Sequence, residues 1–332
     1  MKIIVDVMGG DKSPDETVRG VFAAADELNA GYLLVGNRPD IERIAAEVGF
    51  DLHRVEIVHT DLVIEMEDDP LSVVRAKKES SMALGLQLLS EGRGDAFVSS
   101  GNTGALFAGA TLIPRKIKGV QRAGIGSILP FQNPVLLLDA GANISVNEEN
   151  LLQFAMMGSA YMKQVHGVEN PRVGLLNNGT ETHKGTPLQQ TAYVRLSESP
   201  LIHFVGNVEA STLPFDVCDV LVTDGFTGNI LLKGVEGCGK LLMGRLKEIL
   251  TSTPATKLAA LSMKKQLTQM KQDFDPSERG GAPILGISRP VIKAHGSSDA
   301  KAIKNAIRQA IEYSKSGAIY RIAEEIRKNQ SI

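Results

Sequence analysis

Cysteine is scarce in this sequence and tryptophan is absent. Only Cys218 and Cys238 occur among 332 residues, so neither a disulfide framework nor a cysteine-based zinc site is expected, and both thiols are predicted to be structural. The 36 basic and 38 acidic side chains nearly cancel, and a net charge of −2 argues against a generic nucleic-acid binder. No stretch of about 18 uncharged apolar residues occurs, so no membrane span is expected.

The composition is that of a globular protein, with 43% hydrophobic and 22% charged residues. The N-terminus meets Asp6 after only three apolar residues, which is unlike a secretory signal, and a cytoplasmic location is expected. The length exceeds that of an ordinary domain. We therefore expect a single large α/β domain over residues 1–332.

Short apolar runs alternate with longer amphipathic segments. Strands are predicted at 2–7, 32–35, 55–59, 96–99, 135–139, 173–176, 201–205 and 217–223. Helices are predicted at 14–28, 39–48, 71–89 and 104–113. Ser13 is the predicted cap of the first helix, with Pro14 at its first position. The alternation indicates βαβ units, and hence a mostly parallel sheet flanked by helices.

Glycine-rich polar turns follow five of the predicted strands. They are 6–11 (DVMGGD), 99–104 (SSGNTG), 139–143 (DAGAN), 177–185 (NNGTETHKG) and 224–229 (DGFTGN). Each alone is compatible with an ordinary strand-to-helix turn. Glycine allows the backbone to approach a ligand closely, and a turn that opens a helix presents free N–H groups to an anion. Taken together, the turns predict a phosphate-binding mouth at the carboxyl ends of strands.

The candidate site residues lie on and beside these turns. Lys184 is a compact charge suited to phosphate, although a solvated loop lysine is the alternative. His295 is a candidate phosphate-binding residue in the turn before a helix that Ser297 or Ser298 would cap. The alternative is a histidine that only forms hydrogen bonds within its own turn. The segment 234–240 has the glycine and lysine spacing of a P-loop, but Leu241 replaces the required hydroxyl residue and the pattern is helical, so that motif is rejected.

The five turns, together with 75–82 (RAKKESSM), 279–286 (RGGAPILG) and 294–298 (AHGSS), resemble the bacterial phosphate acyltransferases of phospholipid synthesis. The resemblance runs from residue 1 to about 307, and the strings 175–190 and 224–232 are its most specific parts. The chain departs from the family pattern at 121–126 (QRAGIG) and 210–212 (AST).

The resemblance implies a fold like that of isocitrate and isopropylmalate dehydrogenases and of phosphotransacetylases, usually as a homodimer. It implies transfer of a long-chain acyl group from acyl carrier protein to inorganic phosphate. The acyl phosphate product would serve a membrane glycerol-3-phosphate acyltransferase, so a position at the inner face of the cell membrane is compatible with it. No cofactor and no metal are expected.

The residues suggest how such a transfer would proceed. Phosphate is already an anion near neutral pH, so positioning and preorganised donors matter more than a strong base. Lys184 is predicted to hold phosphate, and Asn229 to donate to phosphate or to the carbonyl oxyanion. Asp224 would orient one of these two, and His183 would protonate the leaving thiolate. The backbone of the glycine-rich turn would supply phosphate donors, from Gly101, Asn102, Thr103 and Gly104.

A basic amphipathic segment over about 238–272 is predicted to form a protruding helical hairpin that breaks at 251–254. It contains seven basic residues and one acidic residue, Glu248. Three interpretations remain open and can coexist: it packs on a second subunit, it contacts the bilayer surface, or it docks an acidic carrier protein. The predicted contact residues are Lys257, Leu258, Leu261 and Lys264.

Three other functions remain as alternatives. A phosphotransacetylase acting on small acyl-CoA would have the same phosphate mouth but no long apolar channel. An isopropylmalate-type dehydrogenase would need a metal-binding carboxylate set and an adenosine site, and neither is visible in the sequence. A non-catalytic protein that binds acyl carrier or phosphate could be distinguished from an acyltransferase only by an activity assay.

Overall fold

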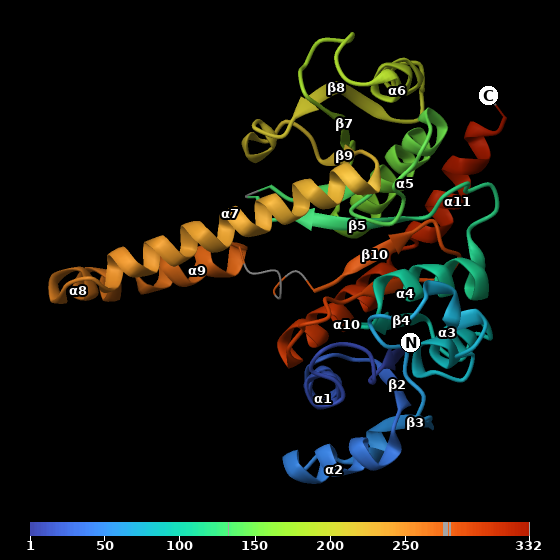
Figure 1. Cartoon of the computed structure of the whole chain (residues 1–332), viewed down its shortest axis with the longest axis vertical. Coiled ribbons are helices and arrows are strands. Elements are labelled where there is room, and N and C mark those ends of the chain that lie inside the picture. Colours follow the sequence, from blue (N-terminus) through green and yellow to red (C-terminus); the bar gives the residue numbers. More distant parts are fainter. Residues whose placement is uncertain (132, 275–277, 279, 332) are drawn as a thin grey trace.

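The computed structural model describes residues 1–131, 133–274, 278 and 280–331, without the side chains of 271–274. Its described strands form one sheet of eleven, in the order β3-β2-β1-β4-β11-β10-β5-β6-β9-β7-β8 (Figure 1). The strands are β1 (Lys2–Asp6), β2 (Gly31–Gly36), β3 (Val55–His59), β4 (Ala96–Ser99), β5 (Gly124–Leu129), β6 (Val135–Leu138), β7 (Arg172–Asn177), β8 (His203–Glu209), β9 (Val220–Val222), β10 (Ala282–Leu285) and β11 (Val291–Lys293).

Most neighbouring strands pair in parallel, as expected. The exceptions are consecutive: β11 with β10, β10 with β5, and β5 with β6 are antiparallel. Three reversals in a row leave β1, β4 and β11 running opposite to β6, β9 and β7. The five glycine-rich turns therefore do not leave one common edge. That expectation was wrong because the segments that became β5 and β10 were not recognised as strands.

Helices cover both faces of the sheet (Figure 1). They are α1 (Asp15–Glu27), α2 (Arg38–Val48), α3 (Ser81–Ser90), α4 (Thr103–Ala110), α5 (Glu148–His166), α6 (Pro187–Ser197), α7 (Gly225–Thr251), α8 (Pro254–Ser262), α9 (Lys264–Phe274), α10 (Ala300–Lys315) and α11 (Ala318–Asn329). Alternate strand residues point to opposite faces, so Ile3 and Ile4 belong to two separate apolar clusters. The first cluster includes α1, α2, α5, α6, α10 and α11, and the second includes α3, α4 and the base of α7.

Three predicted helices differ from the structure. Helix α1 begins at Asp15 without a side-chain cap, because the Ser13 hydroxyl donates to the Gly9 carbonyl instead. The segment predicted as one helix over 71–89 divides into a 3₁₀ turn, Pro70–Val74, and α3, which Ser80 caps. The predicted helix 104–113 becomes α4 followed by a π-helical turn, Thr111–Arg115.

The hairpin protrudes from the body as α7, α8 and α9 (Figure 1). Its tip breaks where predicted, since α7 ends at Thr251 and α8 begins at Pro254 behind the capping hydroxyl of Thr253. Its base differs from the prediction, because α7 is continuous from Gly225 rather than starting near 238. The helix contains several glycines but no proline, and glycine weakens a helix without blocking it. The side chain of Lys271 lies outside the described residues.

Candidate active site

Two buried aspartates organise the turns into two groups. In the first group, Asp6 accepts from the N–H groups of Met8 (3.1 Å) and Gly9 (3.2 Å) and from the Ser99 hydroxyl (2.7 Å). A Cβ on Gly9 would lie 2.7 Å from the Cα of Gly101, so only glycine lets the turns after β1 and β4 meet.

The second group surrounds Asp139, which is fully buried at the end of β6. Its Oδ1 accepts the N–H groups of Ile125, Gly141 and Ala142, and its Oδ2 accepts the backbone and side-chain N–H groups of Asn143. A Cβ on Gly228 would lie 1.9 Å from the Asp139 carbonyl oxygen. The first turn of α7 therefore lies directly against the turn 139–143.

Asp224 has a different role from the predicted one. Its carboxylate caps α7 by accepting the Thr227 N–H at 2.8 Å and the Thr227 hydroxyl at 2.7 Å, rather than orienting Lys184 or Asn229. Asn229 follows in the same first turns of α7 and is exposed. Its side-chain Cγ lies 3.5 Å from where a Cβ on Gly141 would be, so the amide faces the glycine-rich turn.

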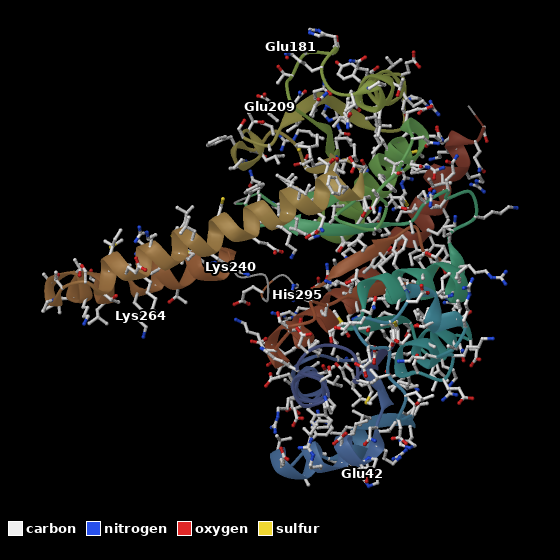
Figure 2. All side chains as sticks on the ribbon, in the orientation of Figure 1. Glu42, Glu181, Glu209, Lys240, Lys264 and His295 are labelled. Carbon is white, nitrogen blue, oxygen red and sulfur yellow. The ribbon has the colours of Figure 1, made fainter. Side chains whose placement is uncertain are left out.

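Lys184 and His183 lie on the turn that follows β7. Asn207 on β8 anchors this turn by donating to the Glu181 carbonyl at 2.9 Å, and Gln190 donates to the His183 carbonyl at 2.7 Å. Because β7 and β9 pair in parallel, this turn and the start of α7 leave the same edge side by side. Within the described residues, no hydrogen bond or ion pair joins Lys184 to Asn229. The outer part of the turn, at Glu181, lies away from His295 (Figure 2).

The turn before α4 offers fewer donors than predicted. Asn102 caps α4 through Oδ1, which accepts the Ala105 N–H at 3.0 Å. Its amide group donates to the carbonyls of Glu65, Met66 and Asp68, so the Asn102 side chain is engaged within the protein, whereas the predicted phosphate donor is the Asn102 backbone N–H. The Gly101 N–H donates to Ser99. The Thr103 and Gly104 N–H groups lie at the helix start, where no intrahelical acceptor exists.

His295 follows β11 beside the first group of turns. The Ser297 N–H donates to its Nδ1 at 3.1 Å, so Nδ1 carries no proton and the neutral ring has its N–H at Nε2. Burial, with a smaller contribution from Lys293 and Lys233, lowers the pKa of His295, which favours that neutral form. The predicted caps of the following helix were wrong, since Asp299 caps α10.

Lys293 and Lys233 are not among the site residues predicted from the sequence. Lys293 ends the short apolar run 290–293 (PVIK), and a lysine closing a buried strand was the available signal. Lys233 stands four residues after Asn229 on α7. No sequence feature distinguished Lys233 from the other lysines of this helix.

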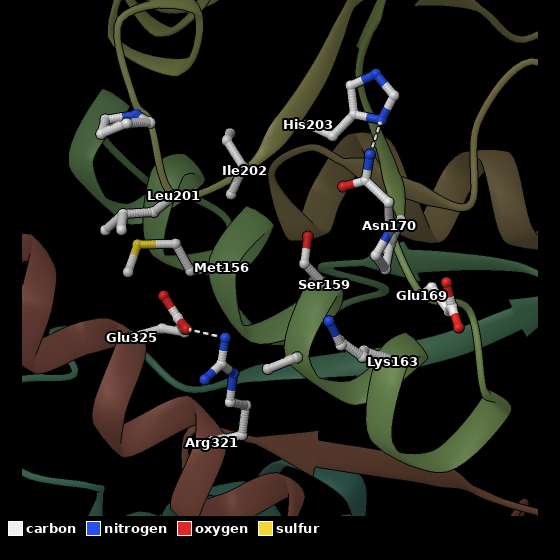
Figure 3. A pocket seen from close by; sticks show the side chains of 13 residues that line it. Met156, Ser159, Lys163, Glu169, Asn170, Leu201, Ile202, His203, Arg321 and Glu325 are labelled. Atoms are coloured by element: carbon white, nitrogen blue, oxygen red, sulfur yellow. Dashed lines mark hydrogen bonds and ion pairs between the residues drawn. The ribbon is translucent and has the colours of Figure 1, made fainter.

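A hollow of about 400 Å³ lies elsewhere, beside the starts of β7 and β8 (Figure 3). Ser159 and Lys163 on α5 line it together with His203, and Arg321 pairs there with Glu325 at 2.6 Å. It contains none of the predicted site residues and lies at the opposite ends of these strands from the glycine-rich turns.

The residues that the structure describes contain no cluster of three histidine, cysteine or acidic side chains able to hold a metal ion. In the same residues, no helix combines the length and apolar character that crossing a bilayer requires.

Comparison with known proteins identifies the family. A family model described as "Fatty acid synthesis protein" matches residues 1–321. A phosphate acyltransferase of Clostridioides difficile is 43% identical over 330 residues, covering 99% of this chain and 97% of that protein. That of Bacillus subtilis is 43% identical over 334 residues, covering 100% and 99%. The chain belongs to the bacterial phosphate acyltransferases. The predictions of the family and of a transferase enzyme in lipid synthesis are confirmed.

Solved structures share the fold at low identity. A phosphotransacetylase from Streptococcus pyogenes aligns with a TM-score of 0.61 at 16% identity, covering 96% of this chain and 94% of that one. A 4-hydroxythreonine-4-phosphate dehydrogenase from Burkholderia phymatum aligns at 0.51 and 16% identity, covering 94% and 98%. The predicted fold class, an α/β protein with a mostly parallel sheet flanked by helices, is confirmed.

Proposed function

We propose that this acyltransferase moves a long-chain fatty acyl group from acyl carrier protein to inorganic phosphate. The observation that supports it most is the pair of turns leaving β7 and β9 side by side. One contains Lys184, whose ammonium has no partner among the described residues, and the other is followed by the exposed Asn229. Charge and neutral amide donors at one edge suit a phosphate acceptor and a developing oxyanion. Family membership favours the same reaction.

In the proposed reaction, a phosphate oxygen attacks the thioester carbon and forms the new C–O bond. The C–S bond breaks, and the electron pair leaves with the carrier thiolate, which takes a proton from His183 or from water. Lys184 holds phosphate and offsets charge, while Asn229 donates to phosphate or to the carbonyl oxygen. His183 is exposed and its ring has no partner among the described residues, so it is free to turn toward the leaving sulfur.

The test is a donor comparison with the purified protein. Palmitoyl-acyl carrier protein, palmitoyl-CoA and acetyl-CoA are each supplied with phosphate, and acyl phosphate is trapped with hydroxylamine. Phosphate-dependent product from the carrier-bound chain alone is expected. Product from acetyl-CoA would instead favour a phosphotransacetylase, and no product from any donor would reduce the site to a binding site.

The hairpin tip is proposed to contact the membrane surface. The enzyme would then be a cytoplasmic protein that associates peripherally with the inner face of the cell membrane. Leu258 and Leu261 on α8 are 72% and 67% exposed, far more than an apolar side chain in a packed helix. Exposed Lys257 and Lys264 flank them and suit anionic lipid. Release at the bilayer would bring a fatty acyl phosphate to a membrane glycerol-3-phosphate acyltransferase.

The remaining hairpin surface suits protein partners. Three large apolar side chains on α7 are exposed, Phe226, Ile230 and Leu241, which favours a homodimer through this helix. The basic residues along the hairpin suit an acidic acyl carrier protein by charge complementarity. Light scattering of the purified protein distinguishes monomer from dimer, and a salt-sensitive KM for the carrier-bound donor would support the docking role.

A further inference from the structure

A lysine that the reaction scheme does not use lies where β11 ends. Lys293 pairs in parallel register with Ser99 on β4 and shares the sheet face of Val291, because strand residues alternate. That face is covered by α4, which packs on β11, and by α7, which packs on β5 and β6. Lys293 therefore leaves the sheet on the face that these two helices cover, at the carboxyl end of β11.

The Lys293 ammonium has no hydrogen bond and no ion pair among the described residues, although it is partly buried. The charges that act on it are those of Lys233 and Glu236 on α7, which pair with each other at 2.8 Å. Burial, and then the repulsion from Lys233, lowers the pKa of Lys293. A charge kept from water without a counterion is costly to the fold.

One neutral donor, His295, accompanies this charge. His295 has its free N–H at Nε2, because Ser297 occupies Nδ1. The Asp11 carboxylate acts on His295 from the turn after β1, and it is not among the charges that act on Lys293. Lys233 lies one helical turn after Asn229, on the same side of α7. The cluster is thus continuous with the proposed oxyanion donor.

We propose that Lys293, with His295 and Lys233, forms a binding site for a phosphate group of a substrate, separate from Lys184. Three donors from β11, the following turn and α7 suit an anion with several acceptor oxygens. The identity of the substrate rests on the proposed function, which offers two sources of a phosphate group. One is inorganic phosphate, and the other is the phosphodiester of the carrier protein's pantetheine arm.

The experiment measures binding without acyl transfer, so it does not depend on the proposed reaction. Calorimetric titration of the full-length protein with inorganic phosphate, and separately with 4′-phosphopantetheine, compares wild type with Lys293→Met. Methionine keeps much of the side-chain volume and removes the charge. Lys163→Met is the matched control, because Lys163 is also without a partner in the described residues but lies beside the hollow of Figure 3.

A loss of about tenfold or more in affinity for one probe is expected for Lys293→Met, on the scale of one charge-assisted hydrogen bond, and none for the control. Weaker binding of inorganic phosphate would assign the site to the phosphate acceptor. Weaker binding of phosphopantetheine, with unchanged affinity for inorganic phosphate, would assign it to the pantetheine arm of the carrier protein. If both affinities stay within about twofold of wild type, the proposal is overturned.

A stability measurement separates this role from a structural one. If Lys293 binds a ligand and does not stabilise the fold, Lys293→Met should unfold at the same temperature as wild type or a higher one in phosphate-free buffer, because the substitution removes an uncompensated charge. A Tm lowered by several degrees would instead assign Lys293 a structural role and overturn the proposal. Lys293→Arg should retain part of the lost affinity.

Discussion

Oδ2 of Asp139 accepts two hydrogen bonds from Asn143, one from its backbone N–H and one from its side-chain amide, both at 2.7 Å. Asn143 in turn donates to the Ala123 carbonyl at 2.7 Å, and a Cβ on Gly225 would lie 2.8 Å from the Asn143 nitrogen. The pair therefore ties the end of β6 to the approach of β5 and to the start of α7.

Asp139→Asn should destabilise the fold by about 3 kcal/mol or more, because an amide would turn N–H groups toward buried donors. Urea unfolding followed by circular dichroism measures the loss. Asp61→Asn, at a carboxylate that is 70% exposed, is the control and should change little. An unfolding midpoint for Asp139→Asn equal to that of wild type would contradict this role.

Lys184→Ala should lower kcat/KM for phosphate by about 100-fold or more, on the scale of one lost electrostatic donor. Steady-state assays with varied phosphate measure it. Lys163→Ala, which removes another lysine without a partner among the described residues, should leave the rate near that of wild type. Unchanged turnover in Lys184→Ala would remove this lysine from the site.

Asn229→Ala should lower kcat/KM by a similar factor of about 100 while the protein stays folded, since alanine is favoured at an exposed helical position. Far-UV circular dichroism should match wild type, and the hydroxylamine assay reports the rate. A wild-type rate would place the oxyanion donor elsewhere on the edge formed by β6 and β9.

Replacing Leu258 and Leu261 together by glutamine should weaken binding to phosphatidylglycerol vesicles by about tenfold or more, because two apolar side chains lose burial. Activity with soluble donor should be spared, because α8 lies at the far end of the hairpin (Figure 1). The matched control replaces Leu112 and Val194, which are 50% and 53% exposed on the body. Equal vesicle binding by both double variants would reject a membrane-contacting tip.

The two cysteines should differ in reactivity. Burial raises the pKa of Cys218 to about 12, so its thiol stays protonated at pH 8, whereas Cys238 is exposed on α7. Iodoacetamide at pH 8 should add one group to the native protein and two in urea, as intact mass shows. Rapid modification of Cys218 in the native state would indicate that the fold opens around the start of β9.

Local sequence pattern located much of the body. The bounds of β3 and β4 match the prediction, because each is a short segment in which apolar residues with high strand propensity predominate. The segments that became β5, β10 and β11 went unrecognised: β5 contains two glycines, β10 a proline, and β11 is only three residues long. Their strand character comes from their neighbours in the sheet rather than from their own composition.

For the site too, local sequence predicted some features and tertiary contacts decided others. Asn102 and Asp224 lie in helix-opening turns, as the sequence indicates, but the predicted roles were a backbone phosphate donor for Asn102 and an orienting carboxylate for Asp224. Only the positions of Ala105 and Thr227 decide that both side chains are caps. Lys293 could not be recognised from its own segment. That its ammonium has no partner among the described residues depends on which elements pack around it.

The sequence by itself determined the family, the alternation of strands and helices, and the glycines that let the turns approach one another, because these depend on residues close along the chain. Tertiary structure decided the direction of each half of the sheet and the grouping of the turns. Of the three consecutive antiparallel pairings that reverse one half, β5 with β6 and β10 with β11 join neighbouring segments, but β10 with β5 joins distant ones. No local pattern encodes that distant pairing.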